Sequence, residues 1–430
     1  MNSRRSAQRI GLALIGAAAL AVTACSPGGS EGGGTGGGSG GDPIEVSVWH
    51  GFTEADGGVV QAIADEYNAS QDTYEVTIEV NPWNVITDKL LPAVASGNGP
   101  DVVVQGVDAG QGYVDQGVFV SMQDFYDDPA YESDSYYQHV VDYSVYDGET
   151  YAVPMGYAPF SVWYNKEMFE KAGVTEFPTT QDAWIDLAEK LTVDENGDGT
   201  PEIYGLSMGD KQASILPTLL QGGGGYVYTD GEVTLDTPEN VETLQWWRDA
   251  YQRGWGPTNV SLPESVDLFK AGKSAMTVIG PWIISGAESV GLDIGVFEMP
   301  AGSEKVAAWA AANYWWVTSQ ADEETTKGAY EFLAYFNNYD SQVKWALEGN
   351  YPPNRTDITS EDVAANPFME TMLKFTENTY VRLAGLPGGA TDVDAELDTL
   401  SVDITSGTDD VATLVTEADA TLTEILSEFE

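Results

Sequence analysis

After a glycine-rich start, the apolar positions of the chain follow two periods in turn. Residues 44–49 (IEVSVW) and 74–80 (YEVTIEV) have the composition and alternation that are typical of strands. Apolar residues fall at helical spacing over 59–67 and 85–95, and a short apolar run at 101–104 predicts a buried strand. Strands that alternate with helices form a parallel sheet with helices on both faces. The pattern therefore predicts an α/β protein.

Later segments carry signals for the starts of helices. Residues 179–191 begin with a Thr-x-x-Asp capping box, and Thr237 followed by Pro238 is an N-cap and first-turn pair. Near the end, 411–429 carries one apolar stripe opposite an acidic face. The 430 residues exceed what one hydrophobic core usually needs, so two domains or lobes are expected.

The N-terminal segment predicts export. Residues 1–9 hold three arginines and no acid, and the apolar run at 10–24 is too short for a permanent membrane span. The run ends in VTAC, which resembles the bacterial lipoprotein lipobox. That resemblance implies a signal peptide over 1–24 and lipidation of Cys25, followed by a flexible Gly/Ser-rich tether to residue 41. A buried cysteine behind an ordinary secretion signal is the alternative, and the export route, Sec or twin-arginine, stays open.

Charge and composition exclude several classes of function. Lysine and arginine number 18 and aspartate and glutamate 68, which gives a net charge of −50. Such a chain repels nucleic acids and anionic lipid surfaces, which are bound through positive patches. With one cysteine and two histidines, neither an internal disulfide nor a zinc site of Cys and His can form. The aromatic share of 11% raises the prospect of a surface that stacks on flat apolar faces.

Four segments in order resemble the extracytoplasmic solute-binding proteins of ABC importers, family 1, which includes maltodextrin-binding protein. They are 89–104 (KLLPAVASGNGPDVVV), 151–173 (YAVPMGYAPFSVWYNKEMFEKAG), 269–282 (FKAGKSAMTVIGPW) and 328–353, which ends in GNYPP. Together they span nearly the whole body of the chain.

The resemblance implies a type II periplasmic-binding-protein-like fold. It has two lobes, each a mostly parallel sheet flanked by helices, with the ligand cleft at the hinge. Within a solute-binding domain at 42–430, lobe one is expected at about 42–156 and 300–345, and lobe two at about 157–299 and 346–430. Loops at the carboxyl ends of strands should supply the ligand contacts.

The resemblance also implies a function without catalysis. The protein would bind a sugar or oligosaccharide at the outer face of the cytoplasmic membrane and deliver it to the transmembrane subunits of a permease. It would be a monomer that touches the membrane only through its lipid anchor. Two alternatives remain: the same fold binding a peptide, polyamine or glycerophosphodiester, or a secreted polysaccharide-acting enzyme that uses paired carboxylates.

A sugar site needs polar groups for the hydroxyls and aromatic rings for the C–H-rich faces. Candidates that follow strands or lie at expected cleft positions are His50, Trp83, Gln105, Asp108, Tyr157, Tyr226, Trp282, Asn313, Tyr314 and Arg355. Trp282 matches the Gly-Pro-Trp segment of the family most directly and is expected to be a stacking platform.

Each candidate also has a structural interpretation. His50 can be a satisfied surface histidine, Gln105 and Asp108 can form a turn, and Trp83 can pack in the core. The glycine run before Tyr226 can be a plain flexible loop, and Arg355 can belong to a surface salt bridge.

A separate segment has the spacing of a calcium loop. Oxygen-bearing side chains occur at alternate positions around a glycine, in Asp194, Asn196, Asp198, Thr200 and Glu202. The twelfth position is Gly205 rather than glutamate, so a remote residue would have to complete the site. We expect a structural Ca²⁺ here and no other cofactor. The alternative is an Asx-rich turn without metal.

Overall fold

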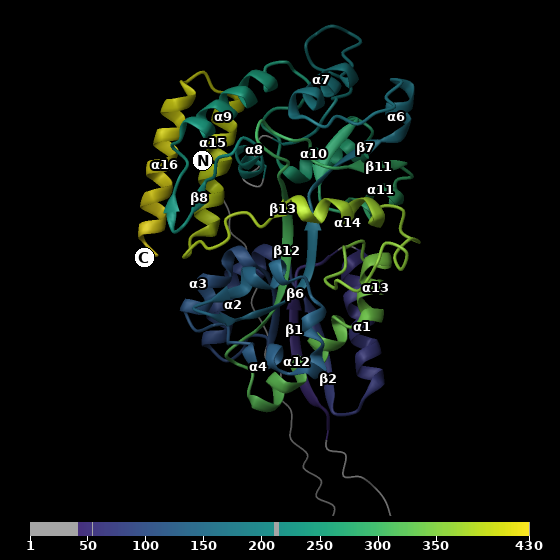
Figure 1. Cartoon of the computed structure of the whole chain (residues 1–430), viewed down its shortest axis with the longest axis vertical. Helices are drawn as coiled ribbons and strands as arrows, with labels where there is room; N and C mark the ends of the chain where they lie inside the picture. The colour runs from purple at the N-terminus through teal and green to yellow at the C-terminus, as the bar shows by residue number, and fades with distance from the viewer. Residues whose placement is uncertain (1–41, 54, 210–214, 430) are drawn as a thin grey trace, which may run out of the picture. The chain divides into compact units, whose positions relative to one another are not determined.

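The computed structural model describes residues 42–53, 55–209 and 215–429, and these belong to one compact unit (Figure 1). The expected signal peptide, Cys25 and the tether lie outside the described residues. Among the described residues, no helix combines the length and apolar character needed to cross a membrane.

The larger sheet has six strands in the order β13-β12-β3-β1-β2, with β6 also paired to β12. The strand β1 pairs in parallel with β2 and β3, whereas β12 runs antiparallel to β3 and β6. The strands are β1 (Ile44–His50), β2 (Tyr74–Val80), β3 (Val102–Gly106), β6 (Ala152–Pro159), β12 (Ala308–Val317) and β13 (Thr379–Tyr380).

Alternation along these strands builds a core on each face of the sheet. Val102 and Val104 pack into one buried cluster together with Trp315, and Val103 packs into the other together with Trp316. Successive side chains of a strand point to opposite faces. Because both faces of the sheet are covered, β3 begins with three valines in a row rather than with alternating polar residues. We call this sheet and its covering helices lobe one.

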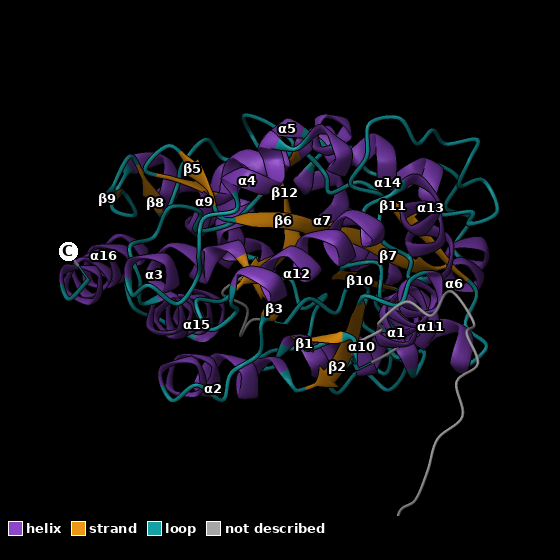
Figure 2. Ribbon diagram, turned by 90° about the horizontal axis from the view of Figure 1, so that it is seen from below, coloured by secondary structure: helices purple, strands orange, loops and turns teal. Residues whose placement is uncertain are grey.

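Helices cover lobe one, and they surround the strands in the view of Figure 2. The long ones are α1 (Ala55–Ser70), α2 (Trp83–Ala95), α12 (Glu323–Phe336) and α13 (Tyr339–Glu348). Shorter elements of this lobe are α3 (Gly110–Asp115), α4 (Gln123–Asp127), α5 (Gln138–Val141), β4 (Val145–Tyr146) and β5 (Glu149–Thr150).

Lobe two is built on a second sheet with its own hydrophobic core. Its central strand β7 (Ser161–Asn165) runs antiparallel to both β10 (Met276–Ile279) and β11 (Ile294–Phe297). The remaining elements are α6 (Lys166–Lys171), α7 (Gln181–Leu191), α8 (Leu216–Gly222), β8 (Tyr228–Thr229), β9 (Glu232–Val233), α9 (Pro238–Tyr251), α10 (Leu262–Lys270), α11 (Ile283–Ser289), α14 (Met369–Phe375), α15 (Ala390–Ser406) and α16 (Val411–Ser427).

The α/β fold expected from the sequence is confirmed, and the strand directions refine it. A mostly parallel sheet holds for β1, β2 and β3 but not for the described strand pairs of lobe two. The strands β6 and β12 form a long antiparallel ladder, because the chain leaves lobe one along β6 and returns from lobe two along β12 (Figure 1).

One expected boundary differs from the structure. The chain was expected to leave lobe one near residue 345. In the structure, Arg355 forms an ion pair with Glu132 and an antiparallel β-bridge with Tyr136, and both of these residues lie in lobe one. Tyr351 likewise stacks on Trp345 in a core cluster of this lobe. Long-range contacts of this kind leave no trace in the local pattern. The remaining lobe bounds stay predictions.

One predicted helix start agrees with the structure and the other differs by one residue. The Thr-x-x-Asp pattern places the N-cap of α7 at Thr179, whereas the N-cap in the structure is Thr180. The Thr180 side chain accepts the Ala183 amide at the start of α7, and Thr237 accepts the Asn240 amide at the start of α9. Each of these hydrogen bonds satisfies a backbone donor that has no partner inside the helix.

Arg248 ties α9 to the turn between α15 and α16. Its side chain is 7% exposed and donates to the carbonyl oxygens of Ile404 at 2.9 Å, Asp403 at 3.0 Å and Asp409. These carbonyls lie in the last turn of α15 or follow it, where the helix itself runs out of donors, although the Asp403 oxygen also accepts the Gly407 amide at 3.0 Å.

We therefore expect Arg248→Met to lower the free energy of unfolding by about 2–4 kcal/mol, because buried acceptors lose a charged donor. Urea unfolding measures the change. The matched control is Arg253→Met, which removes an exposed pairing with Asp186 and Glu189 and should cost less than about 1 kcal/mol. Equal losses in the two variants would contradict the buried tie.

Candidate functional site

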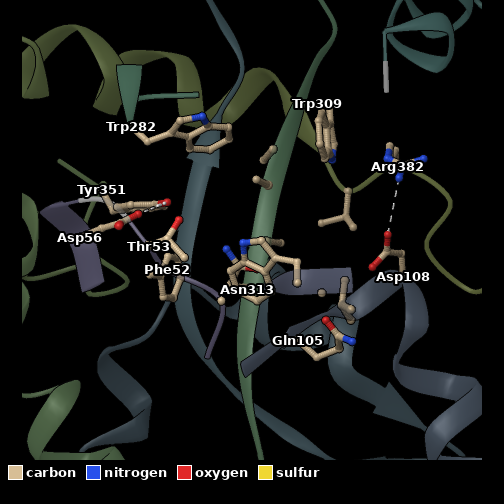
Figure 3. A pocket seen from close by; sticks show the side chains of 18 residues that line it. Phe52, Thr53, Asp56, Gln105, Asp108, Trp282, Trp309, Asn313, Tyr351 and Arg382 are labelled. Carbon is tan, nitrogen blue, oxygen red and sulfur yellow. Dashed lines mark hydrogen bonds and ion pairs between the residues drawn. The ribbon is translucent and has the colours of Figure 1, made fainter. Parts of the chain in front are cut away.

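A cavity of about 540 Å³ opens where the ends of lobe-one strands meet loops from lobe two (Figure 3). Its walls combine aromatic rings with a few polar side chains. The lining residues are Gly51, Phe52, Thr53, Asp56, Trp83, Gln105, Gly106, Val107, Asp108, Trp282, Trp309, Ala310, Ala311, Ala312, Asn313, Tyr351, Val381 and Arg382.

The loop after β1 forms part of the aromatic wall. Phe52 and Trp83 meet edge to face, with ring centroids 5.1 Å apart. A Cβ atom on Gly51 would come within 2.2 Å of the Trp83 ring. Only glycine at position 51 therefore lets the indole, which is 37% exposed, lie against the loop at the edge of the cavity.

Trp282 forms the wall that comes from lobe two. Its ring packs edge to face on Phe160 at 5.5 Å and lies 6.4 Å from Tyr351, at an angle of 28°. A Cβ on Gly280 would approach the Trp282 ring to 2.1 Å, so glycine is needed for the ring to fold back over the backbone. Tyr351 in turn stacks on Trp345 at 4.7 Å, which fixes its ring.

One face of β12 forms the floor. Trp309, Ala311 and Asn313 are partly exposed and alternate with buried neighbours, as expected for a strand with one face toward a cavity. Trp309 packs on Phe160 with centroids 4.0 Å apart. The pairing of β12 with β6 shifts register between Asn313 and Tyr314.

The polar end holds an ion-pair cluster. Arg382 donates to both carboxylate oxygens of Asp394, at 2.7 Å for Nη2–Oδ2, and its Nη2 lies 3.7 Å from Asp108 Oδ2. Burial raises the pKa of Asp108; the charge of Arg382 opposes this rise and that of Asp394 adds to it. Figure 3 shows Arg382 with Asp108 on one side of the cavity and Asp56 with Tyr351 on the other.

The opposite end holds a second carboxylate. The Tyr351 hydroxyl donates to Asp56 Oδ2 at 3.3 Å, and Asp56 Oδ1 accepts the Gly57 amide at 2.8 Å in the first turn of α1. Burial, followed by the charge of Asp56, raises the pKa of Tyr351 well above its ordinary value, so the phenol keeps its proton.

The structure brings five of the predicted ligand residues together: Trp83, Gln105, Asp108, Trp282 and Asn313. They come from both lobes and reach the same cavity. Their contact with a ligand stays a prediction. The other five predicted residues lie outside this lining.

Three of these five are buried structural residues. His50 is 0% exposed and its Nδ1 accepts the Phe52 amide at 3.2 Å, so it shapes the loop behind the cavity wall. The Tyr157 hydroxyl accepts from Thr379 at 2.9 Å, and the Tyr314 hydroxyl donates to Val140 at 2.6 Å. Strand alternation accounts for Tyr314, because it follows Asn313 and faces the opposite side.

The other two lie elsewhere in the fold. Tyr226 is 38% exposed on lobe two, where its hydroxyl accepts from Lys305 at 3.2 Å. Arg355 is 4% exposed and pairs with Asp357 and Glu132 in lobe one. The salt-bridge alternative is therefore correct for Arg355, although the guanidinium is buried rather than on the surface.

The sequence reasoning missed Asp56, Trp309, Tyr351 and Arg382. Trp309 could have been found from the two-residue period that places it on the same face as Asn313. Tyr351 lies in the GNYPP segment that carried the family resemblance. Arg382 had no local signal, because Asp108 lies far from it along the chain and meets it only after folding.

In the loop expected to bind calcium, the side-chain oxygens accept hydrogen bonds from the loop's own backbone. Asp194 accepts the Gly197 and Gly199 amides at 2.7 and 3.0 Å, and Asn196 accepts the Asp198 amide at 2.8 Å. Across the described residues, no group of three or more His, Cys, Asp or Glu side chains is arranged to hold a metal ion. These are the contacts of an Asx-rich turn, and the calcium site stays a prediction.

Comparison with known proteins identifies a family of binding proteins. A model for the family of bacterial extracellular solute-binding proteins matches residues 62–371. The maltotriose-binding protein of Pyrococcus abyssi is 24% identical over 338 residues, which cover 75% of this chain and 69% of that protein.

Solved structures share the fold at low sequence identity. The GacH receptor of Streptomyces glaucescens, solved unliganded and with acarbose, has a TM-score of 0.77 at 21% identity and covers 90% of this chain and 100% of its own. UgpB of Mycobacterium tuberculosis, solved with glycerophosphocholine, has a TM-score of 0.77 at 18% identity, with coverage of 90% and 99%. The two-lobed fold expected from the sequence is confirmed.

Because His50 is buried, we expect the stability of the protein to depend on pH. Desolvation lowers the pKa of His50 to about 4, from 6.5 in the unfolded chain. Because the unfolded state takes up the proton first, stability is lost as the pH falls below about 6.5 toward 4. Between pH 7 and 5 we expect His50 to account for a loss of about 2 kcal/mol.

His50→Asn keeps an acceptor for the Phe52 amide but removes the titration, so it should flatten this slope in urea unfolding at the two pH values. His139→Asn, at an exposed histidine, is the matched control and should change the slope much less. If the pH dependence of stability is unchanged in His50→Asn, His50 is not its source.

Proposed function

Because the chain belongs to the bacterial extracellular solute-binding protein family, we propose that it is an extracytoplasmic receptor that binds a saccharide and delivers it to an ABC importer. Binding takes place in the cavity between Trp282 and the loop after β1. Ligand contacts from both lobes stabilise one lobe arrangement over others, a population shift that a permease can read.

The composition of the cavity is the observation that carries the proposal. Aromatic side chains of Trp83, Trp282 and Trp309 stand beside Gln105 and Asn313 around one space of about 540 Å³. This volume is within the range of about 300–1,000 Å³ that small-molecule sites occupy. Indole rings stack on the C–H faces of sugars, and amides and carboxylates pair with their hydroxyls.

Relatives support a saccharide and also supply the main alternative. The Pyrococcus protein is named for maltotriose, and a 24% identical relative from Brucella abortus is named as an sn-glycerol-3-phosphate-binding protein. Peptides and polyamines find no such support among these relatives. The proposal is binding without turnover, so an oligosaccharide should be recovered unchanged after incubation.

Trp282→Ala is the direct test of the cavity. Loss of one stacking platform should weaken saccharide affinity by roughly tenfold to a hundredfold, corresponding to about 1–3 kcal/mol. Calorimetric titration with an oligosaccharide panel measures it, and the melting temperature of the unliganded variant shows whether the fold persists.

The control is Trp246→Ala, which removes a half-buried tryptophan that does not line this cavity. It should bind as the parent does. If the parent and Trp282→Ala bind the saccharide with equal affinity, Trp282 is not a stacking platform for the ligand. A collapsed melting transition would instead make Trp282 a core residue, whose truncation costs about 3–5 kcal/mol of stability.

We propose in addition that Cys25 carries a lipid and anchors the protein to the membrane. The support is the VTAC segment behind a basic and apolar leader, with a glycine-rich tether after it. Labelled fatty acid should enter the parent protein and Ser30→Ala, and it should not enter Cys25→Ser, which should be released from the membrane. Equal labelling of all three proteins would end this proposal.

A further inference from the structure

Arg382 supplies the cavity's single basic side chain among the described lining residues. Its guanidinium lies over the Trp309 ring, with Cζ 5.2 Å from the ring centroid. An arginine at this place would ordinarily suggest a site for phosphate or carboxylate, because the planar fork matches the two oxygens of such an anion.

The fork of Arg382 is already occupied. Both terminal nitrogens donate to Asp394, in the two-point geometry that an anionic ligand would use. The same Nη2 atom also lies 3.7 Å from Asp108 Oδ2, so two carboxylates contact one guanidinium. Its Nε atom is buried without a partner, and an arginine cannot relieve this by losing its proton.

The second place where an anion could bind is occupied as well. Helix N-termini favour anions, and α1 begins at the cavity edge between Thr53 and Asp56. The Asp56 carboxylate accepts the Gly57 amide and the Tyr351 hydroxyl there. A resident side-chain carboxylate thus holds the position that a ligand phosphate would need (Figure 3).

An incoming anion therefore meets carboxylates at both ends of the cavity. In a partly buried site such like-charge contacts are screened less than at the surface. The same carboxylates favour the binding of a neutral saccharide, because its hydroxyls can donate to Asp108 and Asp56 while its ring lies on an indole.

From this arrangement we propose that Asp108 and Asp394 are specificity-determining residues, which neutralise Arg382 so that the cavity takes an uncharged saccharide and rejects phosphate-bearing ligands. The inference rests on the proposed function and goes further by fixing the charge of the cargo. It separates this chain from relatives named for glycerol phosphate.

The experiment compares matched ligands. Calorimetry measures affinities for a neutral oligosaccharide, its 6-phosphate, glycerol 3-phosphate and glycerophosphocholine. The parent protein should bind the neutral oligosaccharide at least a hundredfold more tightly than its 6-phosphate. Asp394→Asn and Asp108→Asn should each narrow that ratio at least tenfold by strengthening phosphate binding, because the guanidinium is released while the side-chain shape is kept.

Glu417→Gln is the matched control. It removes one negative charge from an exposed position on α16, away from the cavity lining, and should leave the ratio unchanged. Melting temperatures verify that each variant folds. If Asp394→Asn does not fold, Asp108→Asn, which lacks the close two-point contact, still provides the measurement.

The outcomes separate the two proposals. Tighter binding of the 6-phosphate than of the neutral sugar by the parent, or variants with the parent's ratio, overturns the charge selection and leaves saccharide binding in place. If no saccharide binds at all, the proposed function fails. Inorganic phosphate then decides the charge selection: it should raise the melting temperature of the Asp108→Asn/Asp394→Asn double variant and not that of the parent, and any other result overturns it.

Discussion

The antiparallel ladder between β6 and β12 is the constraint on which the rest of the structure depends. It runs from Ala310 opposite Pro159 to Trp316 opposite Ala152, and so joins the segment that leaves lobe one to the segment that returns. Backbone hydrogen bonds fix this pair, because buried amides and carbonyls must be satisfied. One strand, β12, therefore forms the floor of the cavity and also contributes to the core of the larger sheet.

A single change of register divides β12 into a part that forms the floor of the cavity and a part that packs in the core. Before the shift at Asn313 and Tyr314, small residues alternate with Trp309 and leave room above the strand. After it, Trp315 and Trp316 are 0% exposed and fill opposite faces of the sheet. The strand thus supplies an open surface at the cavity and close packing in the core. The side chains of the alanines at 310–312 are small and leave space between the aromatic walls.

The electrostatics of the cavity agree with those of the whole chain. A net charge of −50 already works against anionic cargo at a distance, and the carboxylates beside Arg382 do so at contact range. Long-range repulsion alone would not reject a phosphate, because salt screens it beyond about 10 Å at 0.1 M. The local pairing of Arg382 with Asp394 therefore matters more for selectivity than the total charge.

The sequence by itself determined the α/β class, the start of α9 at Thr237, the start of α7 to within one residue, and the cavity positions of Trp83 and Trp282. These follow from local periods, caps and a family segment, all of which are visible within a few residues. Tertiary structure alone decided that His50, Tyr157 and Tyr314 are buried, and that Arg355 pairs with Glu132.

Tertiary structure also brought Asp56 to Tyr351 and Asp108 to Arg382. The physical reason is that a polar side chain in a sequence does not reveal its partner. Whether it serves a ligand or the fold depends on which distant group reaches it when the chain is packed.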